Sequence, residues 1–304
     1  MKEANTPYHY NSLSEVHRLL GLPKPLHPLI SLINNTANTL PTGHLPAIRT
    51  SVFYKISLKF NLTGKLKYGR QYYDFDEGGM FFVSPHQVTA DSDHNGDHSG
   101  YTLIVHPDFL LTYPLASKIK QYGFFSYSAN EALHLSAKEK ETIITLFKNI
   151  EEELNERFDD MTQDVIISQI ESLLNYSNRF YRRQFITRKA VNADLLLKTE
   201  ILLDEYFNTE KSLFKGVPTV QYLADHLNLS PSYLSDMLRS LTGQNAQQHI
   251  QNRLIDKAKE RLSTTHLSVS EIAYELGFEH SQSFSRLFKS KTKLSPVEFR
   301  QLFT

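Results

Sequence analysis

The stretch Val269-Ser-Glu-Ile-Ala-Tyr-Glu-Leu-Gly-Phe-Glu-His-Ser-Gln-Ser-Phe-Ser-Arg-Leu-Phe-Lys-Ser290 decides the fold of the C-terminal third, because its pattern occurs twice. The earlier copy is Val220-Gln-Tyr-Leu-Ala-Asp-His-Leu-Asn-Leu-Ser-Pro-Ser-Tyr-Leu-Ser-Asp-Met-Leu-Arg-Ser240. Leu223 and Ala224 align with Ile272 and Ala273, and Leu238 aligns with Phe288 after one extra residue in the second turn. Such an internal repeat indicates one supersecondary unit built twice.

Each copy is typical of a helix-turn-helix, which places its second helix in a DNA groove. Asn228 and Gly277 mark the sharp turns, because Asn and Gly tolerate the positive φ that such turns require. Ser230 followed by Pro231 predicts the start of the second helix in the first copy. A capping box from Ser268 to Glu271 predicts the start of the second copy.

The second helix of each copy leaves a polar face as a candidate DNA contact. In the first copy these residues are Ser232, Tyr233, Ser235, Asp236 and Arg239. In the second copy they are His280, Ser281, Gln282, Ser283, Ser285, Arg286 and Lys289. Arg pairs bidentately with guanine and Gln with adenine, whereas small hydroxyls fit near base edges and phosphates. We expect the second copy to supply most of the electrostatic attraction. The alternative is that both faces are ordinary solvated surfaces of a helical bundle.

The segment from Asn245 to Leu262 predicts a helix between the copies, since it lacks Gly and Pro and places apolar residues at helical spacing. A helix of about 19 residues spans roughly 28 Å. One DNA turn is roughly 34 Å. The sequence therefore predicts that the two helix-turn-helix units occupy successive major grooves on one face of a duplex.

The region from about Leu195 to Thr304 resembles the DNA-binding domain of the AraC/XylS family of bacterial transcription regulators. The matching motifs are Ser268-Val-Ser-Glu-Ile-Ala-Tyr-Glu-Leu-Gly-Phe-Glu-His280, Phe284-Ser-Arg-Leu-Phe-Lys289, Leu294-Ser-Pro296 and Phe299-Arg300. The resemblance implies an effector-responsive activator that binds double-stranded promoter DNA, with RNA polymerase as a further partner. It places the polar residues named above at the family's DNA-contacting positions. Asp236 departs from the basic residue often found there, which puts a guanine contact by that position in doubt.

Composition is consistent with a two-domain protein. The chain has 304 residues, which favours two domains, and a formal net charge of zero, which argues against strong non-specific binding to nucleic acid. It has no Cys, so disulfides and thiol chemistry are excluded. The absence of an 18-residue apolar run and of an apolar N-terminal segment predicts a cytoplasmic protein without a membrane span.

The N-terminal part predicts an antiparallel sandwich or small barrel, because apolar residues alternate with period two between about Leu29 and Leu135. Strands are expected at 52–60, from Leu66, at 80–83, 102–105, 124–127 and 132–135. The family's N-terminal domains are commonly cupin-like barrels. The expected fold class is therefore α+β: an N-terminal cupin-like antiparallel β-barrel with two long helices, then an all-α tandem helix-turn-helix domain.

Four segments follow from this reading. Residues 1–135 form the effector-binding barrel, and residues 136–182 form two amphipathic helices that open with a capping box at Ser136. These helices either cover a sheet face or, as the resemblance implies, make a homodimer. Residues 183–197 are a basic linker that either meets DNA phosphate or is a solvated hinge. Residues 198–304 form the tandem helix-turn-helix domain.

The identity of the small-molecule effector is not encoded in any motif. Candidate pocket residues on or near the expected strands are Tyr54, Lys67, Tyr68, Arg70, Tyr73 and His86. A cupin-type metal-dependent enzyme with an appended helical interaction domain is the alternative, prompted by His86, His94, His98 and His106. No His-x-His pair exists, so we predict no metal, no cofactor, no catalytic residue and no enzymatic activity. A third reading is a helical module that binds protein rather than DNA.

Overall fold

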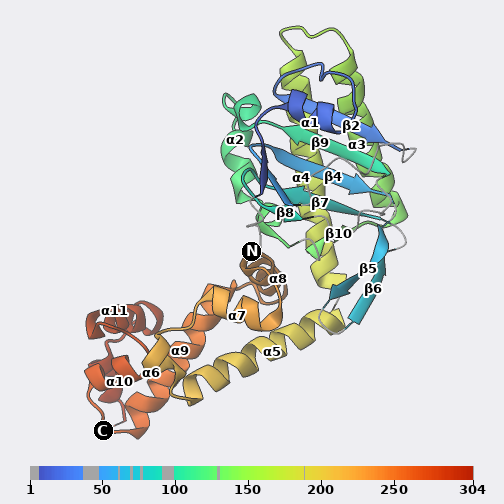
Figure 1. Cartoon of the computed structure of the whole chain (residues 1–304). Coiled ribbons are helices and arrows are strands. Elements are labelled where there is room, and N and C mark those ends of the chain that lie inside the picture. The colour runs from blue at the N-terminus through green and yellow to red at the C-terminus, as the bar shows by residue number, and fades with distance from the viewer. Residues whose placement is uncertain are drawn as a thin grey trace, which may run out of the picture. The chain divides into compact units, whose positions relative to one another are not determined.

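The computed structural model describes residues 7–36, 48–60, 62–68, 71–75, 78–90, 99–128, 131–187 and 189–303 (Figure 1). The chain divides into two compact units, Met1–Gln184 and Phe185–Thr304. The boundary between them lies inside the segment that the sequence predicted as a linker. Each unit is described separately below.

The first unit contains a five-stranded antiparallel sheet in the order β10-β7-β4-β9-β2. Its strands are β2 (Ile30–Asn35), β4 (Tyr54–Lys59), β7 (Gly79–Val83), β9 (Gly100–Val105) and β10 (Leu133–His134). Strand β4 buries Tyr54, Ile56 and Leu58 in alternation, as the period-two pattern predicted. The side chains of Ile56 and Leu58 lie in the core of this unit.

Two smaller sheets accompany the five-stranded one. Strand β3 (Ile48–Ser51) pairs in parallel with β1 (Tyr8–Tyr10) and antiparallel with β8 (Thr89–Ala90). Strands β5 (Leu62–Tyr68) and β6 (Gln71–Phe75) form a separate hairpin. Within the described ranges, β10 and β2 are the edges of the large sheet. The mixed helix-and-sheet class is thus confirmed, whereas these strands do not close into the predicted cupin-like barrel.

The predicted strand at 124–127 is wrong. Phe124, Phe125 and Ser126 belong to a 3-10 helix, η3 (Gly123–Ser126), in which Phe124 and Phe125 pack against Phe82 with ring centroids 4.4 and 5.5 Å apart. Further short helices are α1 (Leu13–Leu19), η1 (Pro107–Leu110), α2 (Leu115–Lys118) and η2 (Ile119–Gln121). A short aromatic run fits a buried strand and a buried turn equally well, so periodicity alone does not distinguish them.

Two long helices cover the large sheet. Helix α3 (Ala137–Asn155) begins with the predicted Ser136–Glu139 capping box and stacks Phe147 on Tyr101 of β9, with centroids 5.4 Å apart. Helix α4 (Thr162–Thr187) contacts the same sheet through Tyr181, whose ring lies 6.2 Å from that of Phe82. The sheet-covering alternative is therefore observed.

The segment at 183–197, which the sequence predicted as a basic linker, is helical where it is described. Helix α4 continues to Thr187, and α5 (Lys189–Asn208) follows; Arg188 lies outside the described residues. Arg183 forms an ion pair with Glu139 at 2.5 Å and donates to the carbonyl of His134 at 2.7 Å. This guanidinium therefore stabilises the first unit.

The second unit is all-helical. After α5 come α6 (Lys211–Lys215), α7 (Val220–Leu227), α8 (Pro231–Thr242), α9 (Ala246–Thr264), α10 (Val269–Glu275), α11 (Ser281–Thr292) and α12 (Pro296–Arg300). Helix α9 contacts α7, α8, α10 and α12, and Figure 1 shows it between α7 and α10. It buries Ile250, Leu254, Ala258 and Leu262, the four residues whose spacing predicted it. Among the described residues no helix has the length and apolar character needed to cross a membrane.

Candidate nucleic-acid interface

The first helix-turn-helix consists of α7 and α8, joined at Asn228. Asn228 has a φ of 55°, in the left-handed region that the sequence predicted for it. The next residue, Leu229, is buried and donates its N–H to the carbonyl of Ala224 at 2.9 Å. The Ser230 hydroxyl then accepts from the N–H of Tyr233 at 3.2 Å and caps α8. The local signals for turn and cap are confirmed.

The second helix-turn-helix, α10 and α11, repeats this backbone arrangement. Ser268 and Glu271 form the predicted reciprocal capping box, with hydrogen bonds of 2.6 and 3.2 Å. Gly277 has a φ of 93°, and Phe278 donates its N–H to the carbonyl of Ala273 at 2.9 Å. This hydrogen bond corresponds to the one from Leu229 to Ala224, so the two turns match in hydrogen bonding as well as in sequence.

The polar face of α8 carries little free positive charge. Ser232, Ser235 and Asp236 are half-buried, and Arg239 is exposed. The carboxylate of Asp236 accepts a hydrogen bond from the guanidinium of Arg239 at 2.9 Å. The cation on this helix is therefore already paired with a neighbouring acid, as the balance of charges in the sequence suggested.

Tyr233, which the sequence predicted as a DNA contact, is buried in this structure. Its side chain is only 2% exposed and packs edge-on against Phe185, with ring centroids 5.1 Å apart. Phe185 lies 48 residues earlier, outside the repeated unit, so no local pattern indicated this contact. Tyr233 belongs to the core of the second unit.

The polar face of α11 is exposed and basic. His280, Gln282, Ser283, Arg286 and Lys289 are exposed, Ser281 and Ser285 are half-buried, and Phe284 and Phe288 are fully buried on the opposite side. Among the ion pairs of the described residues none involves Arg286 or Lys289, although, after the hydrogen bond from the N–H of Ser295, Lys289 contributes to lowering the pKa of Glu298. This face therefore presents unpaired cations beside hydrogen-bonding side chains.

Cations elsewhere in the second unit are largely paired. On α9, Arg253 pairs with Asp204, Lys257 with Glu260 at 2.9 Å, and Arg261 with Glu275 at 2.5 Å. The pairs leave α11, with Lys291 and Lys293 at its C-terminal end, as a concentrated positive surface on a chain of zero net charge. Local charge of this kind attracts phosphate even when the whole chain is neutral.

The predicted effector residues lie in three different sheets or turns. Tyr54 is in the core of β4, where burial raises the pKa of its phenol and its ring meets Phe125 edge-on at 5.1 Å. His86 is exposed, has a φ of 65°, and stacks on His9 with ring centroids 6.1 Å apart. Lys67 and Tyr68 lie on β5 and Tyr73 on β6, and Arg70 falls outside the described residues.

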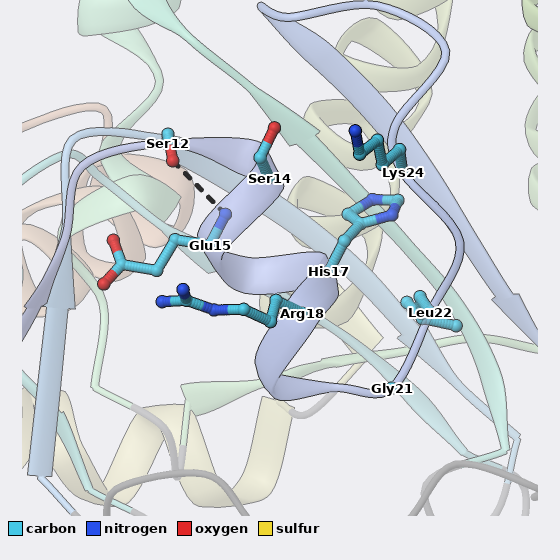
Figure 2. Close-up of a pocket in the computed structure, with 8 residues that line it drawn as sticks. All are labelled: Ser12, Ser14, Glu15, His17, Arg18, Gly21, Leu22 and Lys24. Carbon is cyan, nitrogen blue, oxygen red and sulfur yellow. Dashed lines mark hydrogen bonds between the residues drawn. The ribbon is translucent and has the colours of Figure 1, made fainter.

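A surface pocket of about 750 Å³ lies instead beside α1 and the loop that follows it (Figure 2). Its lining residues are Ser12, Ser14, Glu15, His17, Arg18, Gly21, Leu22 and Lys24. Glu15 is already engaged, because it accepts from the hydroxyl of Tyr8 at 2.7 Å and from the N–H of Asn11 at 3.1 Å. The hydrogen bond from Tyr8 is the main cause that lowers the pKa of Glu15. No periodicity or motif in this polar stretch indicated a pocket.

The described residues contain no cluster of three His, Cys, Asp or Glu side chains placed to hold a metal ion. Of the four histidines that prompted the metal-enzyme alternative, His94 and His98 lie outside the described residues. The ring of His106 packs edge-on against Phe53, with centroids 5.6 Å apart, and its Nδ1 accepts from the N–H of Asp108 at 3.2 Å.

Comparison with known proteins identifies the domain that contains both copies. A family model of a helix-turn-helix domain matches residues 223–302. An uncharacterized HTH-type transcriptional regulator, YfiF of Bacillus subtilis, is 31% identical over 143 residues, 47% of this chain and 42% of the relative. The arabinose operon regulatory protein of Escherichia coli is 38% identical over 78 residues, 26% of this chain and 27% of the relative.

Among solved structures, the C-terminal domain of the two-component response regulator yesN from Fusobacterium nucleatum is similar. It is 30% identical to this chain, covers 36% of it and 98% of that domain, and has a TM-score of 0.31. The chain matches less than half the length of either curated relative. The helix-turn-helix domain at residues 223–302 is therefore of the AraC/XylS type, and the curated relatives that share it are named as regulators.

Proposed function

We propose that this protein regulates transcription by binding double-stranded promoter DNA, with one helix-turn-helix in each of two successive major grooves. The observation that carries the proposal is the exposed face of α11, where unpaired Arg286 and Lys289 lie beside Gln282 and Ser283. Lys and Arg side chains without an intramolecular ion pair are available to bind DNA phosphates. Gln and Arg can in addition form bidentate hydrogen bonds that distinguish one base from another.

In this proposal α11 supplies most of the affinity, and α8 supplies a weaker, more polar contact. The candidate contacts on α11 are His280, Ser281, Gln282, Ser283, Ser285, Arg286 and Lys289. Those on α8 are Ser232, Ser235, Asp236 and Arg239. Helix α9 has 19 residues, which corresponds to about 28 Å of helix, close to the roughly 34 Å of one DNA turn.

The test begins with selection of a preferred duplex from random DNA by the full chain. Gel-shift titration then compares the wild type with a Gln282→Ala, Arg286→Ala double variant, which we expect to lose specific binding. Insertion of about five base pairs between the two half-sites moves one of them to the opposite face of the duplex, so binding should fall to the single-site level. No preferred sequence from the selection would contradict the proposal and would favour the protein-binding module.

We further propose that the first unit responds to a small-molecule effector and that α4 contributes to a homodimer. Support for the dimer comes from the exposed apolar side chains of Val165 and Tyr176 on α4, each 37% exposed, and of Met161 just before the helix, 57% exposed. An apolar surface of this kind on a helix favours contact with another helix.

The dimer is tested by sedimentation of Val165→Glu and Tyr176→Glu, which should shift the protein to monomer. Leu111→Glu is the matched control, because Leu111 is 67% exposed but lies on a different element. The effector proposal predicts that DNA affinity or half-site spacing changes when a small molecule binds. Identical gel-shift titrations with every bound compound would contradict it.

The relatives are named as regulators, which supports a role without catalysis. If the protein activates transcription, RNA polymerase is a further partner, and the protein acts in the cytoplasm, where promoter DNA is found. Reporter expression from the selected duplex placed upstream of a minimal promoter separates activation from repression.

A further inference from the structure

The turn of the second helix-turn-helix touches the segment that leads into the first. Gly216, which ends α6, and Gly277, in the turn between α10 and α11, have φ values of 77° and 93°. A Cβ on Gly277 would lie 2.4 Å from the carbonyl carbon of Gly216 and 2.7 Å from the nitrogen of Val217. Real Cβ atoms do not approach that closely, so the two backbones contact each other directly and leave no room for a side chain.

Two hydrogen bonds join the same place. The hydroxyl of Ser212, which is 3% exposed, donates to the carbonyl of Glu275 at the end of α10 at 2.7 Å. The hydroxyl of Tyr206 on α5 donates to the carbonyl of Gly216 at 2.9 Å. Both acceptors are backbone atoms, so these bonds fix the position of the main chain rather than that of a mobile side chain.

The path from this contact to the first helix-turn-helix is short. Only Val217, Pro218 and Thr219 separate Gly216 from the start of α7. Pro218 is buried, and proline has a fixed φ. The hydroxyl of Thr219 accepts from the N–H of Tyr222 at 3.1 Å and caps α7. A displacement of Gly216 therefore displaces the start of α7.

We propose that Gly277 is a positioning residue for DNA recognition, and the inference rests on the function proposed above. Ser212, Gly216 and Gly277 form a brace that connects the two helix-turn-helix units independently of α9. Helix α9 connects the two units through side-chain packing, whereas the brace connects them a second time through main-chain atoms. This second connection restrains rotation of the units about α9, so α11 keeps a fixed offset from α8 along the duplex.

The test compares full-length wild type and Gly277→Ala on three duplexes. The first is the selected operator, the second is the operator with one base pair inserted between the half-sites, and the third is a half-site for the second copy alone, measured at low salt. Two linked contacts bind about 10²–10⁴-fold more tightly than either alone, so loss of correct offset should weaken operator binding about tenfold or more. Half-site affinity should stay unchanged, and the variant should discriminate less against the inserted base pair.

Gly243→Ala is the matched control. Gly243 also has a φ of 77°, but a Cβ there meets no atom within 4 Å, so this variant reports the strain of positive φ alone. It should keep the spacing preference of the wild type. Ser212→Ala removes one hydrogen bond of the brace without forcing the backbones apart, and it should flatten the spacing preference in the same direction but by less.

Circular dichroism shows whether Gly277→Ala folds; if it does not, Ser212→Ala decides the question. Equal loss on the operator and the half-site, with the spacing preference retained, would overturn the positioning role, because Gly277 would then serve only its own turn. Failure of the wild type to select any duplex is a different result and overturns the proposed function itself.

Discussion

The two helix-turn-helix copies have the same backbone conformation at their turns but differ in the charge of their second helices. Both turns have a positive φ followed by a 2.9 Å hydrogen bond back to the alanine of the preceding helix. On α8, however, Arg239 is paired with Asp236, whereas Arg286 on α11 has no acidic partner among the described residues. The two copies therefore present their second helices, α8 and α11, in the same geometry, whereas the polar faces of these two helices differ. We call α8 and α11 the reading helices. The predictions below test that division, from the largest expected effect to the smallest.

Because the two copies have the same fold, replacing a buried core side chain by Ala in either copy should strongly destabilise the second unit. Phe284 and Leu234 are each fully buried on the inner face of a reading helix. Phe284→Ala should lower the free energy of unfolding by about 3–5 kcal/mol and Leu234→Ala by about 2–5 kcal/mol, because each leaves a cavity. Denaturant unfolding followed by circular dichroism measures both. A loss below about 1 kcal/mol in one copy only would show that its helix is not held by the common core.

The difference in charge predicts unequal losses when the arginines are removed. Arg286→Ala should weaken operator binding by about 1–3 kcal/mol if its guanidinium reads a base. Arg239→Ala should cost less, because that guanidinium is already shared with Asp236, and Ser232→Ala less again because no charge is lost. Fluorescence anisotropy with the selected duplex measures all three. Equal losses for both arginines would remove the proposed difference between the copies.

Asp236→Asn should make the DNA-binding face of the first copy more like that of the second in charge. The change removes a negative charge near phosphate and releases Arg239, so DNA binding should tighten at low salt. The plot of log affinity against log salt should become steeper by about one unit if Arg239 gains a phosphate. The pair is a surface ion pair worth about 0–1 kcal/mol, so stability should change little. Asp225→Asn is the control, since Asp225 lies on α7 and accepts from Gln221 instead; an equal gain there would mean that only net charge matters.

The capping boxes predict a pH dependence that acts on the second copy. A hydrogen bond from the Ser268 side chain is the main cause that lowers the pKa of Glu271, and the N–H of Ser295 does the same for Glu298. A carboxyl with a lower pKa in the folded state stabilises the fold above its unfolded-state pKa. That stabilisation disappears as the pH falls through the folded-state pKa.

The unfolding temperature of the second unit should therefore fall in acid. Glu271→Gln should make this fall with pH shallower, because an amide oxygen accepts the same hydrogen bond but does not titrate. The cap of α8 contains Ser230 but no carboxyl partner, so Ser230→Ala should lower stability by a similar amount at every pH. A steeper decline for Glu271→Gln than for the wild type would contradict the assignment.

The sequence predicted the second unit in detail because its signals are local. Asn228, Gly277, Ser230 and the Ser268–Glu271 pair specify turns and helix starts within four residues of themselves, and the structure places each of them as expected. The apolar stripe of α9 was equally direct. By contrast, Tyr233 was assigned to the reading face because its burial depends on Phe185, which the repeat does not contain.

The first unit was harder to predict because its fold depends on pairings between distant residues. Alternation identified β4, β7 and β9 but did not determine whether the sheet closes, and the described strands leave it open. The aromatic run at 124–127 satisfied the requirements of a strand and became a 3-10 helix packed on Phe82. The pocket beside α1 arises from a stretch with no periodicity, so only coordinates could show it.

The matching hydrogen bonds from Leu229 and Phe278 have a consequence for protein engineering. Because each turn is closed by main-chain atoms, the outward side chains of one reading helix are not needed to form it. The solvent-facing residues of α11 are therefore suited to grafting onto α8 at equivalent positions. The resulting chimera would recognise a near-direct repeat, and comparison of its binding motif with that of its parent would assign each half of the motif to one helix.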